Sequence, residues 1–260
     1  MTKVHYVSGD LLDLATIKSI IEERKVLELS NEVVLNIEKS KKYLEKKILN
    51  NSQPIYGINT GFGSLYNVKI ASDDLTKLQE NIVMSHACGT GNLVPKEIVK
   101  LMLLLKVQSL SYGYSGVQLK TIQRLVDFYN LDITPLIYEL GSLGASGDLA
   151  PLAHMALPLI GKGEVYYKNE IRPAKDILNQ LDFEPIKLEA KEGLALLNGT
   201  QFMSAYGIFS LIKSHKLSYL SDLISCISID AFNCNMSPFD PLVHLVLSLI
   251  HISEPTRRYS

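Results

Sequence analysis

Apolar side chains that recur every three or four residues constrain this sequence more than any other feature. Such spacing is typical of helices that bury one face, and it covers most of the chain. The stripes are formed by Ile17, Ile20, Ile21 and Leu27; Val33, Val34, Ile37, Tyr43, Leu44 and Ile48; Leu75, Leu78, Ile82 and Val83; and Leu119, Ile122, Leu125, Val126 and Tyr129. A mainly α fold is therefore predicted.

Residues that favour helix ends support this prediction. Asp73 and Asp74 can cap the third stripe. Pro95 is tolerated in the first turn of a helix that carries the apolar run from Ile98 to Leu110. A further, long helix is expected from about Thr200 to Ile229.

Strand signal is weak and local. The segment EVYYKNEIR, from Glu164 to Arg172, predicts a small hairpin that turns at Lys168–Asn169. The sequence contains no internal repeat and no low-complexity linker.

The composition excludes several classes of protein. With 260 residues, of which 47% are hydrophobic, the chain can bury a sizeable core. A net charge of -1 without a polybasic block argues against nucleic acid as a partner. Cys88, Cys226 and Cys234 lack metal-ligand spacing and favour a reducing compartment. Met1–Asp10 has no signal-peptide core, and Ile98–Leu110 is too short to span a membrane. A soluble cytoplasmic protein without metal is expected.

A glycine-rich segment, GSLGASGDLAPLAH, runs from Gly141 to His154. Three interpretations are open. The first is a tight connection closed by Asp148 as a helix cap, and the second is an anion site at a helix N-terminus. A nucleotide phosphate loop is disfavoured, because no Walker lysine follows and no strand precedes. In the third interpretation the backbone itself reacts.

The third interpretation has a physical basis in the run Ala145-Ser146-Gly147. Attack of the Gly147 nitrogen on the Ala145 carbonyl carbon closes a five-membered ring, which only residues of low bulk permit. Loss of water from the ring and from the Ser146 side chain leaves an exocyclic methylidene. That group is an electrophile that no standard side chain provides.

The run Ala145-Ser146-Gly147-Asp148 in this context resembles the signature of the aromatic amino acid ammonia-lyase family. The resemblance implies that Ala145, Ser146 and Gly147 cyclise autocatalytically to methylidene-imidazolone, with Asp148 completing the cofactor-forming motif. Two departures, at Leu143 and at Tyr138-Glu139-Leu140, leave the cyclising triad untouched.

The resemblance extends over nearly all of residues 3–246 and implies a fold of the ammonia-lyase/fumarase-like class. Residues 1–199 would form the amino-terminal domain that bears the electrophile, and residues 200–246 the start of a central bundle of long helices. Family members are about twice as long and assemble as homotetramers. Their carboxy-terminal half supplies an arginine for the substrate carboxylate and a substrate-selecting glutamate.

Three further segments take on roles through the same resemblance. Tyr56, in YGINTGFG, is by itself an ordinary tyrosine beside a flexible loop, but it matches the family's catalytic base, which needs a nearby positive charge or helix N-terminus to favour phenolate. Ser85 and His86, in MSHACGTG, match the pair that contacts a polar substrate ring. Asn198, in EGLALLNGTQ, would stabilise charge on the electrophile or the substrate, and Gln201 is a candidate for substrate binding.

The resemblance implies elimination of ammonia from an aromatic amino acid. Histidine is the first choice of substrate, because LLNGTQFMSAYG (Leu196–Gly207) and LLLKVQSLSYGYSG (Leu103–Gly116) are similar to bacterial histidine lyases. Tyrosine or phenylalanine ammonia-lyase and aminomutase activity are alternatives. A helical scaffold, in which the glycine-rich loop is only a connection, is the non-enzymatic alternative.

The last residues differ from the rest. Leu247–Arg257 reads LSLIHISEPTR and resembles the in-frame translation of a sequencing-library adapter; an apolar helix end before a proline turn is the other interpretation. We expect residues 247–260 to be adapter-derived. A chain that ends natively near Val246 is expected to be inactive by itself.

Overall fold

The computed structural model describes residues 3–50, 53–63, 66–68, 70–71 and 74–246. The expected adapter-derived tail, residues 247–260, lies outside them. The chain forms two compact units, Met1–Ser210 and Leu211–Ser260, which are described separately. Helices dominate both, so the predicted mainly α fold is confirmed. The predicted domain division after residue 199 stays a prediction.

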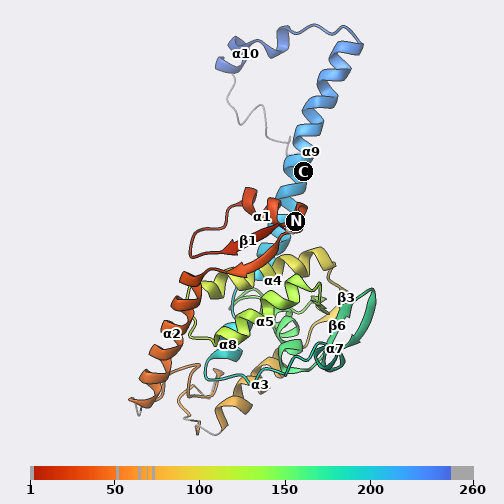
Figure 1. The fold of residues 1–260 in the computed structure, drawn as a ribbon. Helices are drawn as coiled ribbons and strands as arrows, with labels where there is room; N and C mark the ends of the chain where they lie inside the picture. Colours follow the sequence, from red (N-terminus) through yellow and green to blue (C-terminus); the bar gives the residue numbers. More distant parts are fainter. Residues whose placement is uncertain (1–2, 51–52, 64–65, 69, 72–73, 247–260) are drawn as a thin grey trace, which may run out of the picture. The chain divides into compact units, whose positions relative to one another are not determined.

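The first unit contains short strands between helices (Figure 1). Its elements are β1 (Val4–Val7), α1 (Leu14–Glu22), β2 (Val26–Leu29), α2 (Asn31–Leu49), α3 (Leu75–His86), β3 (Thr90–Leu93), α4 (Lys96–Ser111), α5 (Leu119–Asn130), β4 (Thr134–Pro135), β5 (Tyr138–Leu140), α6 (Leu149–Ala156), the 3-10 helix η3 (Leu157–Ile160), β6 (Glu164–Tyr167), β7 (Glu170–Pro173), α7 (Ala174–Gln180), α8 (Glu192–Leu197) and the start of α9 (Gln201–Ala231).

Helix α4 forms the centre of the core. It is apolar on nearly every side, as expected for a helix surrounded by other elements, and α5 packs beside it (Figure 1). Buried large side chains such as Met102 and Leu104 contribute roughly 1.5–3 kcal/mol each. The one charged member of this buried set is Lys106, which is 1% exposed.

The strands correct part of the sequence analysis. Leu27 lies in β2 rather than on a helix, because α1 ends at Glu22 and Arg24 takes a left-handed backbone conformation. Strand β2 pairs in parallel with β1, with Val4 opposite Val26. Such short strands place only two residues on each face, which is too few for a clear period.

The other strand pairs are antiparallel. The predicted hairpin is confirmed as β6 and β7, with Lys168 and Asn169 both at positive φ in the turn. Strand β4 extends this pair on the side of β6, and β3 pairs with β5. The predicted cap of α3 is corrected: Asp74 precedes Leu75, but its side chain makes no capping hydrogen bond. Asp73 lies outside the described residues.

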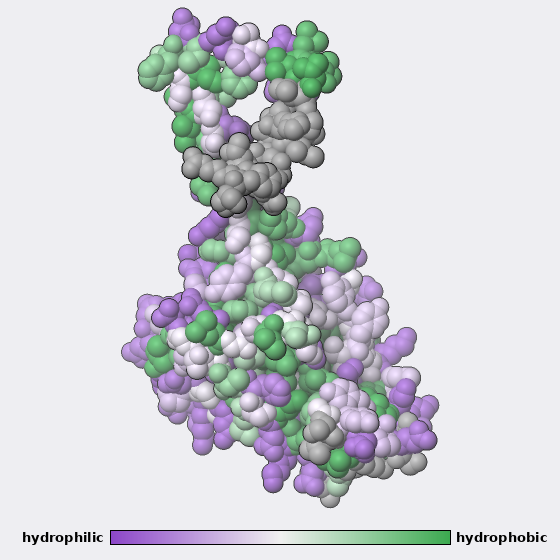
Figure 2. Space-filling view, turned by 180° about the vertical axis from the view of Figure 1, so that it is seen from behind, coloured by the Kyte–Doolittle hydropathy of each residue, from purple (hydrophilic) through white to green (hydrophobic). Residues whose placement is uncertain are grey.

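The long helix predicted from about residue 200 is confirmed as α9. Beyond Ser210 the chain continues through α9, η4 (Ser237–Phe239) and α10 (Pro241–Val246). Apolar side chains are open to solvent along this second unit, where Figure 2 shows green hydrophobic residues. They include Leu211, Leu217, Leu223, Ile224 and Ile227. Within the described residues, no helix combines the length and the apolar character needed to cross a membrane.

Candidate active site

The glycine-rich segment forms an irregular loop between β5 and α6, so a short strand precedes it, contrary to the expectation from the sequence. Ala145 and Ser146 are exposed there, whereas Gly147 packs against the segment that precedes α9. Gly147 has φ +104, and a Cβ at this position would lie 2.6 Å from the carbonyl oxygen of Gly199. Only glycine fits both the backbone conformation and this close approach.

Asp148 anchors the loop. Its side chain is 1% exposed; Oδ1 accepts a hydrogen bond from Ser142 Oγ at 2.9 Å, and Oδ2 accepts one from the backbone N–H of Met203 at 3.0 Å. Its own N–H donates to the Gly199 carbonyl at 2.8 Å. The cap interpretation is therefore corrected: Asp148 precedes α6 but makes no side-chain cap there, and its carboxylate instead caps the N-terminus of α9.

Asn198 lies beside this loop, directly after α8. Its Oδ1 would be 3.2 Å from a Cβ at Gly147, so the amide faces the predicted ring-forming residues. Its carbonyl oxygen accepts a hydrogen bond from Lys106 Nζ at 2.9 Å. Sequence reasoning missed Lys106, because a lysine within an apolar helical run gives no sign of a partner 92 residues away.

Gln201 is the first residue of α9 and is 8% exposed. Its side chain packs over Gly199, and its Oε1 has no hydrogen-bond partner among the described residues. A buried amide oxygen without a partner is costly. Gln201 is therefore available to a donor that the described chain does not supply.

Ser85 and His86 lie at the carboxyl end of α3. Both side chains bond to the same acceptor, the carbonyl oxygen of Ile82: Ser85 Oγ donates at 3.1 Å and His86 Nδ1 at 2.8 Å. A carbonyl oxygen only accepts, so Nδ1 carries the proton. In the neutral form of His86 the lone pair would then lie on Nε2.

His154, which the sequence analysis left without a role, connects this segment to α6. Its Nε2 accepts a hydrogen bond from the backbone N–H of Gly89 at 3.0 Å, and its ring meets Tyr138 edge to face at 5.1 Å. Burial lowers the pKa of His154 below 6.5, which favours the neutral acceptor form. The helix that follows the Ala-Ser-Gly run thus holds the chain just beyond His86.

Tyr56 lies in the loop between α2 and α3. Its side chain is 57% exposed and meets the Phe62 ring edge to face at 6.0 Å. The neighbouring Gly57 rests on α8, since a Cβ there would lie 2.5 Å from Leu194 Cδ2. The positive charge or helix N-terminus that Tyr56 needs as a base stays a prediction.

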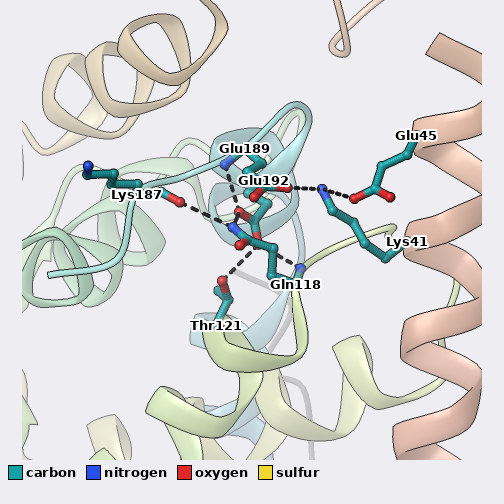
Figure 3. Close-up of polar contacts among 7 residues, drawn as sticks. All are labelled: Lys41, Glu45, Gln118, Thr121, Lys187, Glu189 and Glu192. Atoms are coloured by element: carbon teal, nitrogen blue, oxygen red, sulfur yellow. Dashed lines mark hydrogen bonds and ion pairs between the residues drawn. The ribbon is translucent and has the colours of Figure 1, made fainter. Parts of the chain in front are cut away.

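Helix α8 contacts Gly57 and precedes Asn198 directly. The buried carboxylate of Glu192 fixes this helix to its neighbours (Figure 3). Glu192 is fully buried and accepts hydrogen bonds from Gln118 N, Thr121 Oγ1 and Glu189 N, each at 2.8 Å, and from Gln118 Nε2. Next to it, Gly193 N donates to Gln79 Oε1 of α3 at 2.9 Å. Because α8 is tied to α3 and to the start of α5, Asn198 has a rigid support.

The outer end of the same network is ionic. Lys41 of α2 pairs with Glu189 at 2.6 Å and with Glu45 at 3.9 Å (Figure 3). Glu192 itself is satisfied by neutral donors, which is how a buried carboxylate stays solvated within a protein. No cluster of three or more histidine, cysteine or acidic side chains suited to a metal ion occurs in the described part of the chain.

The structure brings one set of the predicted residues into contact. Gly147 and Asp148 contact the segment that contains Asn198 and Gly199. Helix α3, which carries Ser85 and His86, packs against both α6 and α8. The glycine-rich loop therefore lies against the Asn198 amide, with an imidazole on an adjacent helix, which is consistent with the lyase class expected from the sequence.

Comparison with known proteins agrees with this class. The family model for aromatic amino acid lyases matches residues 12–249. The chain belongs to the aromatic amino acid lyase family.

Within that family the chain is similar to histidine ammonia-lyases. It is 44% identical over 240 residues to the histidine ammonia-lyase of Geobacillus sp. strain WCH70, which covers 92% of this chain and 47% of the relative. The chain thus spans about half the length of the curated relatives it matches.

Solved structures show the same fold. The histidine ammonia-lyase of Trypanosoma cruzi superposes with a TM-score of 0.84 at 36% identity, over 93% of this chain and 47% of that one. Phenylalanine aminomutase of Pantoea agglomerans gives a TM-score of 0.86 at 29% identity, over 95% and 47%. The expected fold class, that of ammonia-lyases, is confirmed.

Proposed function

We propose that this chain forms the electrophile-bearing part of an ammonia-lyase that converts L-histidine to trans-urocanate and ammonia. The observation that carries the proposal is the Ala145-Ser146-Gly147 loop, clamped at Gly147 and Asp148 against Asn198 and Gly199. The 44% identity to a histidine ammonia-lyase supports histidine as the substrate.

The loop has the features that a methylidene-imidazolone requires. Gly147 occupies a cradle that a Cβ would fill, Ala145 and Ser146 are free of packing that would oppose ring closure, and Asp148 fixes the following residue. We therefore assign the group to Ala145, Ser146 and Gly147. When formed, it supplies an electrophile that makes the substrate amine a better leaving group. No metal and no nucleotide is part of the proposal.

The chain's own residues bind the substrate and move its protons. Tyr56, exposed on its loop, would remove the β-proton. Neutral His86 would offer Nε2 as an acceptor for the N–H of a substrate imidazole, with Ser85 beside it. Asn198 would donate to oxygen as charge develops, and the unpaired Oε1 of Gln201 would accept from the substrate.

Two further properties belong to the same proposal. The apolar side chains exposed beyond Ser210 support assembly with further copies, as a homotetramer. The three cysteines are unpaired thiols, which supports a cytoplasmic protein. Nucleic acid and membrane are not partners in this proposal.

The likeness to phenylalanine aminomutase makes an aminomutase the second candidate. Product analysis separates the two, because an aminomutase retains nitrogen in a β-amino acid whereas a lyase releases ammonia.

Mass spectrometry and an activity assay test the proposal together. In the chain extended to the length of its relatives, the peptide containing Ala145–Gly147 should lack the mass of two waters, and histidine should yield urocanate. A helical scaffold predicts no mass deficit. A deficit together with conversion of tyrosine or phenylalanine but not histidine would contradict the substrate assignment alone.

A further inference from the structure

Lys106 is a cation in the centre of the core. It lies in the middle of α4 and is 1% exposed, although lysine is almost never fully buried without a partner. On the same helix, Lys100 reaches the surface and pairs there with Asp132. The burial of Lys106 therefore needs a reason that is specific to its position.

The described residues supply Lys106 Nζ with one hydrogen-bond partner, the carbonyl oxygen of Asn198 at 2.9 Å. The next carbonyl, that of Gly199, accepts the Asp148 N–H at 2.8 Å. The Asn198–Gly199 segment is thus held from two sides, by the core helix α4 and by the loop that contains Gly147.

Burial of the Lys106 ammonium group opposes folding. Burial lowers its pKa from 10.5 to about 7, because the interior cannot solvate an ammonium group. The neutral amine still donates to a carbonyl oxygen. An apolar side chain of similar length would fill the same space without this cost, so stability does not explain a lysine here.

We propose that Lys106 is a positioning residue of the active site: by holding the Asn198 carbonyl oxygen, it fixes the Asn198 amide beside Gly147. This inference rests on the proposed function. In this proposal Lys106 acts on the reacting groups indirectly, through Asn198.

A double-mutant cycle tests the inference in the chain extended to the length of its relatives. Lys106→Met should lower kcat for histidine by roughly 10- to 100-fold, because small misplacements of an aligned group cost about this much. KM should change little, and the dehydrated fraction of the Ala145–Gly147 peptide should fall. In an Asn198→Ala background the same substitution should have little further effect, because its route of action is gone.

Lys100→Met is the matched control, with the same substitution on the same helix at a residue paired at the surface; its kcat and dehydrated fraction should equal those of the wild type. Lys106→Gln keeps an N–H donor in a shorter side chain and should retain more activity than Lys106→Met. If Lys106→Met does not fold, Lys106→Gln takes its place in the cycle.

Unchanged kcat, or equal losses in the presence and absence of the Asn198 side chain, would overturn the positioning role. Failure of the wild type to dehydrate would instead count against the proposed function.

Discussion

His154 and Gly89 are joined by a hydrogen bond in which the backbone N–H of Gly89 donates to Nε2 across 3.0 Å. The bond exists only while Nε2 carries a lone pair, so it requires neutral imidazole. It connects the helix that follows the glycine-rich loop to the segment that follows His86.

The burial of His154 makes stability depend on pH in a definite direction. Burial places the folded pKa of His154 below the unfolded value of 6.5. The unfolded state therefore binds more protons in this window, and stability should fall as pH drops from 6.5 through the folded pKa. His154→Phe should show a smaller fall between pH 7.5 and pH 5 in urea midpoints. An identical pH profile in the variant would show that protonation of His154 does not cause the fall in stability.

Lys106→Met should stabilise the fold while it impairs the proposed chemistry. The folded pKa of Lys106 is about 7 and the unfolded value 10.5, so wild-type stability rises with pH between them. Below pH 7 the buried charge costs on the order of 5 kcal/mol. In Lys106→Met the Asn198 carbonyl oxygen loses its hydrogen-bond donor, which reduces the expected stabilisation by about 1–3 kcal/mol.

The measurement is the difference in unfolding free energy between Lys106→Met and wild type at several pH values. The difference should favour the variant most below pH 7 and decrease towards pH 10.5. A variant that is less stable than wild type at pH 6 would mean that the lysine contributes to the fold itself.

Ser146→Ala should abolish turnover and the mass deficit of its peptide, because in the proposed group the methylidene carbon comes from the Ser146 side chain. Since Ser146 is exposed, thermal unfolding should be nearly unchanged. The adjacent exposed position Leu143 offers a control: Leu143→Ala should keep both the deficit and the activity. Near-normal turnover in Ser146→Ala would refute the cofactor assignment.

Tyr56→Phe removes one hydroxyl from a side chain that is 57% exposed. A positioned base contributes roughly 10²–10⁴-fold, so kcat should fall by that factor. Stability should stay within about 0.5 kcal/mol of wild type. Tyr66→Phe, another exposed tyrosine, is the control in the same steady-state assay, and an unchanged kcat in Tyr56→Phe would require a different base.

The apolar residues exposed beyond Ser210 should make residues 1–260 associate when expressed alone, without lyase activity. Exposed patches of this kind promote association. Leu217→Glu combined with Ile224→Glu should shift the chain towards monomer in size-exclusion chromatography, whereas Lys216→Glu, at another exposed position, should not. A monodisperse, active 260-residue wild type would contradict both parts.

The sequence predicted features whose signal is continuous along the chain. Helix α9 and the β6–β7 hairpin were predictable because their periodicity and turn residues are local. The parallel pair β1–β2 was not, since four-residue strands carry almost no period and the pairing joins segments on either side of α1.

The candidate site likewise has features that the sequence could predict and features that it could not. The Ala-Ser-Gly-Asp run is contiguous and therefore recognisable, and it lies against Asn198. The bonds that support it join distant residues through backbone groups, as between Lys106 and the Asn198 carbonyl or between Gly89 and His154. Backbone acceptors and donors exist at every residue, so no sequence pattern distinguishes these two.

The carboxylate of Asp148 binds an N–H that lies 55 residues further along the chain, at Met203. A ribosome completes the Ala-Ser-Gly-Asp run long before it adds Gly199 and Met203, so a growing polypeptide carries the reactive sequence without the groups that hold it. The clamped loop therefore forms only after α9 has begun to emerge, and if the loop cyclises as proposed, that step follows synthesis of this helix rather than of the motif.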